Sequence, residues 1–243
     1  MKTEVIFGIH PVYEALRAGR RSFGEVCVAK FSKRLDAVAA YAESRNVPVK
    51  RIRPAQLKAI TGTDFHQGIC ARTSLYPLAE ISDMLDSAEN VFLLLLDSIL
   101  DPHNLGALVR TAVCAGVGGI VIPKDRSASP TPEVSKASAG ALEHALLARV
   151  TNMARTVSDL KGKGVWIGGM DVGGSRSVFD SNLSGPFALV VGGEEKGIRP
   201  LVRKQCDFLI SIPQKGPLNS LNASVAGAVA MYEVFRQRRL GNP

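Results

Sequence analysis

The sequence predicts an α/β protein whose larger sheet is mostly parallel. Short runs that are apolar on both faces, such as Val91-Phe-Leu-Leu-Leu-Leu96, alternate with helical patterns, as in sheets covered by helices on both sides. Charge adds a division into two parts. Residues 1–74 hold thirteen Lys and Arg against six Asp and Glu, which is +7 of the net +8. We therefore expect a small basic domain followed by a larger, nearly neutral one.

Residues 1–76 are expected to form a compact α/β domain. Leu35, Val38, Ala39 and Ala42 recur at helical spacing, and Pro54 is well placed to begin a short helix. The expected elements are helices over 11–18, 34–44 and 54–60, with strands over 25–29, 47–52 and 68–73. Residues 77–90 are interpreted as a linker that contains a short helical turn around 82–87.

Residues 91–243 repeat the alternation with longer elements. The expected strands cover 91–97, 119–122, 164–169, 187–191 and 208–212, and the expected helices cover 104–115, 133–146, 152–161, 199–205 and 221–238. At 243 residues the chain has room for both domains to bury a core.

Composition argues against several classes of protein. The longest strongly apolar run has six residues, against the roughly 20 that a membrane helix needs. The N-terminus lacks the pattern of a secretory signal, so we expect a cytoplasmic protein with no membrane partner. The four cysteines and four histidines are scattered without metal-ligand spacing, which predicts reduced, buried thiols and no bound metal. The basic balance favours a polyanionic partner such as a nucleic acid.

A first polar cluster, Asp97-Ser-Ile-Leu-Asp-Pro-His-Asn104, follows the apolar strand and leads into a helix. Asn104 is a candidate N-cap for that helix, where a side-chain oxygen can accept from unpaired backbone N–H groups. Arg110 stands out in a segment of Leu, Val and Ala. It is either a surface arginine paired with a carboxylate or a contact for an anion such as a ribose phosphate.

Two more clusters follow late strands. Gly192-Gly-Glu-Glu-Lys-Gly197 can approach a flat ligand closely because glycine has no side chain. Ser220-Leu-Asn-Ala-Ser224 opens the last helix, whose start favours negatively charged groups. The small residues of that helix allow close packing in a core or against a second subunit. This late position differs from that of dinucleotide-binding domains, in which the glycine turn follows the first strand.

Together, these clusters resemble the three signature motifs of the SpoU/TrmH family of RNA ribose 2′-O-methyltransferases, within the SPOUT superfamily. The resemblance extends to the N-terminal part through Phe7-Gly-Ile-His-Pro and Phe65-His-Gln-Gly-Ile. The most similar subfamily is the bacterial 23S ribosomal RNA guanosine 2′-O-methyltransferases, which share the pattern Pro123-Lys-Asp-Arg-Ser-Ala128.

The resemblance implies a trefoil-knotted catalytic domain, a homodimer packed through the knot, and a substrate domain resembling ribosomal protein L30e. It implies S-adenosylmethionine as cofactor, S-adenosylhomocysteine as product and RNA as partner. The catalytic residues that it assigns are Arg110, Asn104, Glu194, Ser220 and Asn222. The cofactor-binding residues that it assigns are Gly192, Gly193, Gly197, Ile212, Leu221 and Ser224.

Arg110 matches the residue that is proposed as the base in this family. Because a guanidinium stays protonated at neutral pH, we expect it to hold a phosphate and stabilise alkoxide charge. Glu194 is expected to position groups. The alternatives are methylation of a ribose in transfer RNA or at another ribosomal site, a non-catalytic RNA-binding or assembly protein, and a dinucleotide-dependent oxidoreductase, which the missing glycine fingerprint disfavours.

Overall fold

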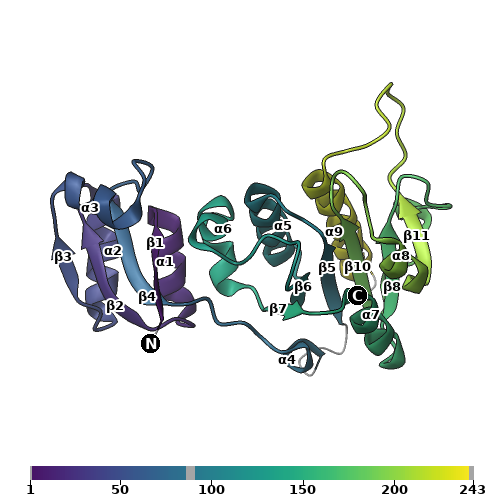
Figure 1. Cartoon of the computed structure of the whole chain (residues 1–243), viewed down its shortest axis with the longest axis horizontal. Coiled ribbons are helices and arrows are strands. Elements are labelled where there is room, and N and C mark those ends of the chain that lie inside the picture. The colour runs from purple at the N-terminus through teal and green to yellow at the C-terminus, as the bar shows by residue number, and fades with distance from the viewer. Residues whose placement is uncertain (1, 86–90, 241–243) are drawn as a thin grey trace. The chain divides into compact units, whose positions relative to one another are not determined.

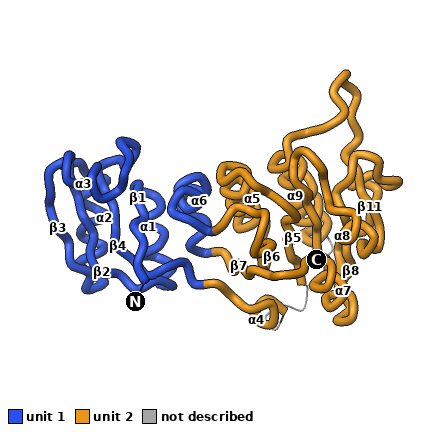
Figure 2. Tube along the Cα trace, in the orientation of Figure 1, with its two compact units in different colours: residues 1–77, 130–144 blue, residues 78–129, 145–243 orange. Residues whose placement is uncertain are grey.

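A computed structural model describes residues 2–85 and 91–240 of the chain and divides it into two compact units (Figures 1 and 2). Unit 1 comprises Met1–Pro77 together with Pro130–His144, and unit 2 comprises Leu78–Ser129 and Ala145–Pro243. The chain therefore passes from one unit to the other three times. Residues 86–90 of the expected linker lie outside the described residues.

Unit 1 is built on a four-stranded sheet with the order β1-β4-β2-β3. Strands β1 and β2 pair antiparallel with β4, and β3 pairs parallel with β2. Its elements are β1 (Thr3–Phe7), α1 (Ile9–Ala18), β2 (Phe23–Val28), α2 (Lys33–Ser44), β3 (Val49–Arg51), α3 (Pro54–Thr61), β4 (Ile69–Ser74), α6 (Pro132–Ala137) and the 3₁₀ helix η1 (Ala141–His144). The N-terminal strand β1 was not expected from the sequence. The helix over 34–44 was expected, and its predicted apolar face is buried.

The prediction of one helix over 133–146 is wrong. Helix α6 stops at Ala137, and the chain turns at Ala139 and Gly140, whose φ angles of 52° and 86° are left-handed. A Cβ on Gly140 would come within 2.8 Å of the His10 carbonyl oxygen, so the turn brings this segment against α1. Strand β7 (Leu147–Val150) then follows, in a stretch for which no element was predicted.

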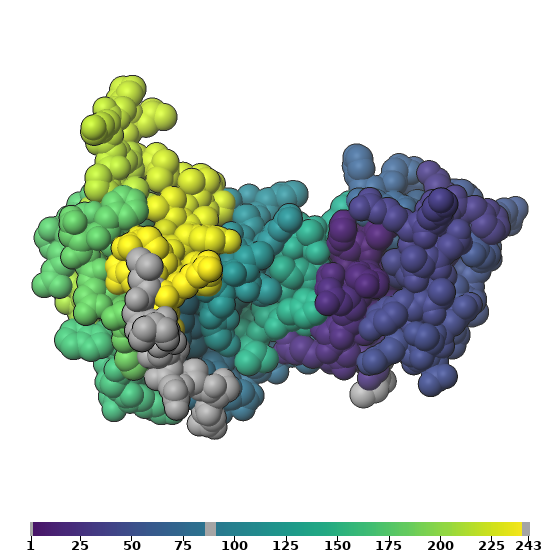
Figure 3. Space-filling view, turned by 180° about the vertical axis from the view of Figure 1, so that it is seen from behind, coloured from purple at the N-terminus to yellow at the C-terminus, as the bar shows by residue number. Residues whose placement is uncertain are grey.

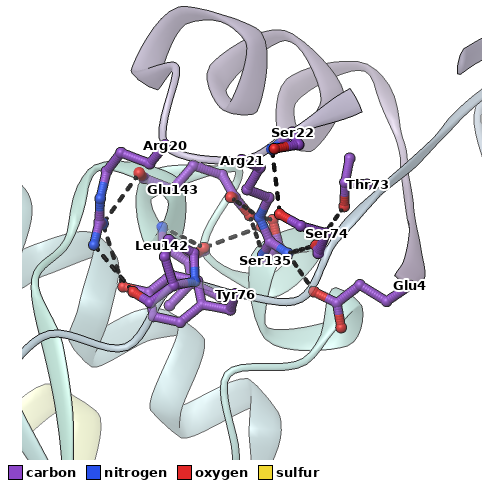
Figure 4. A network of polar contacts seen from close by, with 12 residues as sticks. Glu4, Arg20, Arg21, Ser22, Thr73, Ser74, Tyr76, Ser135, Leu142 and Glu143 are labelled. Carbon is purple, nitrogen blue, oxygen red and sulfur yellow. Dashed lines mark hydrogen bonds and ion pairs between the residues drawn. The ribbon is translucent and has the colours of Figure 1, made fainter. Parts of the chain in front are cut away.

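A buried ion pair holds the segment 130–144 in unit 1 (Figure 4). The Arg21 side chain is 1% exposed; its Nε lies 2.5 Å from Glu143 Oε2 and its Nη2 lies 3.1 Å from Glu143 Oε1. Its Nη1 contacts Glu4 and donates to the Ser74 carbonyl oxygen, while Ser135 Oγ donates to Glu143 Oε1 at 2.7 Å. Two carboxylates thus surround one buried guanidinium.

Unit 2 contains a seven-stranded sheet in which every pair of neighbouring strands is parallel, as predicted. The strand order is β7-β6-β5-β10-β8-β11-β9. Its elements besides β7 are α4 (Ile81–Leu85), β5 (Phe92–Asp97), α5 (Pro102–Cys114), β6 (Gly119–Pro123), α7 (Met153–Gly162), β8 (Trp166–Met170), β9 (Arg176–Ser177), the 3₁₀ helix η2 (Val178–Asp180), β10 (Phe187–Gly192), α8 (Pro200–Gln205), β11 (Phe208–Ser211) and α9 (Ala223–Leu240).

The core of unit 2 lies on both faces of this sheet. Leu93 and Leu95 of β5 pack in one cluster with residues of α7 and with Val202 of α8. On the other face, α5 packs along α9, where a Cβ on Gly227 would come within 2.5 Å of Leu108 Cδ2. Gly227 of the last helix therefore serves close helix packing within the chain. Among the described residues, no helix is long and apolar enough to cross a membrane.

The cysteines are all free thiols. Cys27 and Cys70 are buried opposite each other on β2 and β4, and Cys206 is half-buried. The expectation of buried thiols is wrong for Cys114, which is exposed at the end of α5.

Candidate functional site

A buried carboxylate holds the loop that follows β10. Asp97, the last residue of β5, is fully buried and accepts from the backbone N–H and the Nε of Arg199, both at 2.8 Å. The backbone N–H of Gly193 donates to the Asp97 carbonyl oxygen at 2.9 Å. This pair was not among the predicted site residues. The signal was available, because a carboxylate at the end of an entirely apolar strand needs a cation or several donors.

Two glycines of this loop allow the backbone to fold on itself. A Cβ on Gly192 would lie 2.1 Å from the carbonyl carbon of Gly197, and a Cβ on Gly193 would lie 2.4 Å from the carbonyl oxygen of Ser98. These distances exclude any side chain unless the backbone moves. The glycines predicted to lie at a ligand site thus pack backbone against backbone, and the next residues extend from the carboxyl edge of the sheet.

Three predicted residues from three distant segments meet at Glu194. The Nδ2 of Asn222 donates to Glu194 Oε1 at 2.9 Å and lies 3.2 Å from Asn104 Oδ1. The Nδ2 of Asn104 also donates to Glu194 Oε1. Two amides therefore orient one exposed carboxylate, which gives Glu194 a fixed position.

Asn222 also organises the start of α9. Its Oδ1 accepts from the backbone N–H of Ser224 at 2.9 Å and from Ser224 Oγ at 2.6 Å. The sequence had suggested Asn104 as the N-cap of α5, and this prediction is wrong. Pro102 begins that helix, and the carboxylate of Asp101 caps it by accepting from the backbone N–H of His103 at 2.9 Å. The Asn104 side chain is thereby left to contact Glu194.

A cavity of about 360 Å³ opens at the carboxyl ends of β8, β10 and β11. Met170, Val191, Ile212 and Leu221 contribute apolar surface. Of the predicted residues, those that line this cavity are Gly192, Gly193, Glu194, Gly197, Ile212, Ser220 and Leu221. Asn104, Asn222 and Ser224 lie outside its lining but contact it through Glu194 or through the start of α9.

Arg110 is placed differently from the other predicted residues. It is exposed on α5 and is not part of the cavity lining. Within residues 2–85 and 91–240, its guanidinium has no hydrogen bond or ion pair. It is therefore available to a ligand or to a second chain. The carboxylate partner that the sequence offered as an alternative is not found among the described residues.

Exposed aromatic side chains with cations beside them lie on unit 1. Phe31 is 82% exposed, and the Arg51 guanidinium lies 4.4 Å from the centre of its ring. Phe65 is 76% exposed, and Lys136 Nζ lies 5.4 Å from its ring centre while donating to the Phe65 carbonyl oxygen at 2.7 Å. Burial lowers the pKa of Lys136. Exposed rings flanked by cations suit the stacked bases and phosphates of single-stranded RNA.

No group of three or more His, Cys, Asp or Glu side chains that could hold a metal ion occurs among the described residues. The site consists instead of backbone groups, amides, hydroxyls and a carboxylate.

Comparison with known proteins identifies the family. Residues 91–232 match the model of the SpoU rRNA methylase family, and residues 5–79 match the model described as RNA 2′-O ribose methyltransferase substrate binding. The chain belongs to the SpoU rRNA methylase family. This SpoU chain is 39% identical over 241 residues to the 23S rRNA (guanosine-2′-O-)-methyltransferase RlmB of Escherichia coli K12, an alignment covering 97% of this chain and 99% of the relative.

A second relative is RlmB of Yersinia pestis, 40% identical to the SpoU chain and covering 98% of this chain and 99% of its own. Among solved structures, the SpoU methyltransferase AviRb of Streptomyces viridochromogenes in complex with AdoMet superposes with a TM-score of 0.84. It is 23% identical, with 98% of this chain and 92% of AviRb covered. That likeness confirms the SpoU methyltransferase fold.

Proposed function

We propose that this chain transfers a methyl group from S-adenosylmethionine to the ribose 2′-oxygen of a guanosine in 23S ribosomal RNA. The observation that carries the proposal is the meeting of Asn104, Glu194 and Asn222 beside the glycine-lined cavity. A non-catalytic RNA-binding protein would have no need for this arrangement. The two RlmB relatives, both named for 23S rRNA guanosine, favour that substrate over transfer RNA.

The cavity at the ends of β8, β10 and β11 fits S-adenosylmethionine. Its volume of about 360 Å³ and its mixture of apolar side chains with exposed backbone are typical of cofactor sites. Gly192, Ile212 and Leu221 would hold the adenosine part, since glycine permits close backbone approach and the other two offer apolar surface. Bound there, the cofactor supplies an electrophilic methyl group and leaves as S-adenosylhomocysteine.

The reaction would be an in-line displacement in which the ribose 2′-oxygen takes the methyl group and the 2′-hydroxyl proton passes to solvent. It would depend on alignment because the departing thioether needs no protonation. Glu194, held by two amides, positions groups at the wall of the cavity, and Ser220 contributes a hydroxyl to the same lining. Arg110 holds a phosphate of the RNA and stabilises charge that develops on the 2′-oxygen. As its guanidinium is exposed and unpaired among the described residues, this contact requires no existing ion pair to break.

The proposal includes a homodimer formed through the last helix and the trefoil knot that the resemblance implies. Val225, Ala228, Tyr232 and Phe235 recur at spacings of three, four and three residues, so they share one face of α9. Val225 is 47% exposed and Tyr232 49%, an apolar stripe that a second chain would cover. Figure 3 shows this helix, in yellow, at the surface of unit 2. The basic substrate domain, similar to ribosomal protein L30e, and a cytoplasmic location complete the proposal.

The decisive experiment incubates the purified chain with radiolabelled S-adenosylmethionine and 23S rRNA from cells that lack the gene. Label at a guanosine ribose, located by nuclease mapping, is expected for the wild type. Arg110→Ala should lose at least about a hundredfold in rate, and Arg155→Ala, an exposed arginine on α7, should not. Label on a base, or in transfer RNA alone, would contradict the proposal, and tight binding of NAD with none of S-adenosylmethionine would place the chain in another class. If Arg110→Lys kept near-normal turnover at neutral pH, the planar guanidinium would not be needed.

A further inference from the structure

A second cavity lies on the other side of the loop that follows β10. It has a volume of about 490 Å³, and its lining includes Ser98, Leu100, Asn104, Arg126 and Glu194. Its walls come from the ends of β6, β5 and β10, which are neighbours in the sheet. Residues 193–197 line both this cavity and the proposed cofactor cavity, apart from Lys196, which lines this one alone. A group bound here would therefore lie next to the proposed cofactor, along the loop residues that both cavities share.

The backbone of this second cavity is strained at two positions. Ser98 has a φ of 70° and Arg126 a φ of 55°, which is the left-handed region that residues other than glycine rarely adopt. The backbone N–H of Ala128 and Ser127 Oγ both donate to the Ile99 carbonyl oxygen, at 2.8 Å and 3.3 Å, and so tie the two strained loops together. Backbone strain that the surrounding structure maintains is concentrated at binding and catalytic sites.

The side chains of the cavity suit one nucleotide of an RNA strand. Leu100 is 66% exposed and offers an apolar surface to a base. The Arg126 guanidinium is exposed, and it has no hydrogen bond or ion pair among the residues that the structure describes. Arginine presents a planar fork of N–H donors that matches a phosphate.

Of the other charged groups that line this cavity, Lys196 is a second cation, but it directly follows Glu194 and Glu195 in the chain. Asp101 is occupied as the cap of α5, and Arg199 is paired with buried Asp97. Glu194 and Glu195 lie with Lys196 in the loop after β10, whereas Arg126 belongs to the loop after β6, with β5 between these strands. A phosphate at Arg126 would therefore be held by a different loop from the one that carries the two glutamates.

We infer that this cavity receives the target nucleotide, with the ribose at the wall formed by Asn104 and Glu194, the base against Leu100 and a phosphate on Arg126. The inference rests on the proposed function. It assigns to Arg126 a substrate contact separate from that of Arg110. It also explains why the loop after β6 is held in a strained conformation.

The test compares Arg126→Ala, Arg126→Gly and Arg155→Ala in binding and in methyl transfer. The glycine variant removes the guanidinium and also the cost of the left-handed backbone, so it separates loss of the contact from misfolding of the loop. RNA binding is measured by fluorescence anisotropy of a labelled 23S rRNA fragment without cofactor, at several salt concentrations. Binding of S-adenosylmethionine, measured by calorimetry, checks the fold.

Both Arg126 variants are expected to weaken RNA binding and raise KM about tenfold and to reduce the slope of log affinity against log salt by about one, as for one lost phosphate contact. Affinity for S-adenosylmethionine should change less than about twofold. Arg155→Ala should match the wild type.

Three results would overturn the inference. One is a wild type that methylates RNA while both Arg126 variants match Arg155→Ala in affinity and salt slope. Another is a loss of cofactor affinity as large as the loss of RNA affinity. The third is a loss that disappears when the target guanosine is replaced by adenosine, since Arg126 would then read the base. A wild type that methylates no RNA would instead refute the proposed function.

Discussion

Replacing Glu143 by alanine should destabilise unit 1 by about 3–5 kcal/mol, the usual cost of breaking a buried ion pair from one side. Glu143 and Arg21 each have side chains that are 1% exposed. Without the carboxylate, Arg21 loses two of its N–H contacts and Ser135 loses its acceptor, although Glu4 still faces the guanidinium. Buried groups left unpaired cost about 1–3 kcal/mol each, which agrees with the same total.

The assay is native-state hydrogen exchange, followed in peptides that cover α1 and the segment 130–144. Glu143→Ala should lower the opening free energy in both peptides together, because the pair joins residues 122 positions apart in one unit. Glu133→Ala, an exposed change in the same segment, is the control and should stay within about 0.5 kcal/mol. The double variant Arg21→Leu with Glu143→Leu should recover much of the loss, since an apolar pair leaves no buried charge.

Equal effects of Glu143→Ala and Glu133→Ala would refute the assignment of 130–144 to unit 1. A double variant whose loss equalled the sum of the single losses would show that the two side chains do not act as a pair.

Three further outcomes are expected. Asn222→Ala removes a hydrogen-bond donor to Glu194 and the acceptor for Ser224. The rate of single-turnover methyl transfer should fall about 10–100-fold, which corresponds to the loss of one hydrogen bond to a charged group. An unchanged rate would mean that Glu194 needs no orientation. Burial raises the pKa of Cys70 to about 12 and of Cys206 to about 11, so exposed Cys114 should react first with a thiol reagent at pH 8, and Cys114→Ser should abolish the fast phase. The hydrogen bond from Lys50 lowers the pKa of Glu25. The stability that ionised Glu25 contributes is therefore complete above its pKa in the unfolded chain and is lost as pH falls through its pKa in the folded chain. Glu25→Gln should flatten the acid limb of a plot of unfolding free energy against pH.

The larger sheet could be predicted from sequence because its strands are buried on both faces. The apolar run over 91–96 predicts strand β5 without reference to the rest of the chain, and the glycine cluster after β10 predicts a backbone turn. The same local reading fails where a distant contact decides the structure. Helix α6 stops at Ala137 and the turn at Gly140 packs against α1, a contact that residues 133–146 alone do not reveal.

The residues of the candidate site likewise fall into those that motif spacing predicts and those that depend on distant contacts. Motif spacing selected Asn104, Glu194 and Asn222, and these residues meet. It did not select Asp97, whose role depends on Arg199, or Arg126, whose role depends on a strained backbone conformation. Arg126 is recognised by its dihedral angle, which only coordinates supply, whereas a carboxylate at the end of an apolar strand already indicates that Asp97 needs a partner.

The segment 130–144 shows how the two family regions are combined. It lies within the 91–232 match to the SpoU rRNA methylase model, yet its packing places it in the unit that contains the substrate-binding match. Homology and compactness therefore divide the chain at different residues. Because the chain crosses between the units three times, a shorter chain that ended at residue 77 would lack Glu143 and leave Arg21 with one carboxylate partner.

The loop over 193–199 connects the two proposed halves of the reaction. Its tip carries Glu194, which lines both cavities, and its base is fixed by fully buried Asp97 through Arg199 and Gly193. An in-line displacement requires the attacking oxygen and the methyl group to be held in register, and misplacement by about 1 Å can cost a hundredfold in rate. A loop that lines both cavities can hold them in register as one element, because any shift of the loop moves both sites together. Asp97 therefore fixes the base of the loop on which the proposed alignment would depend.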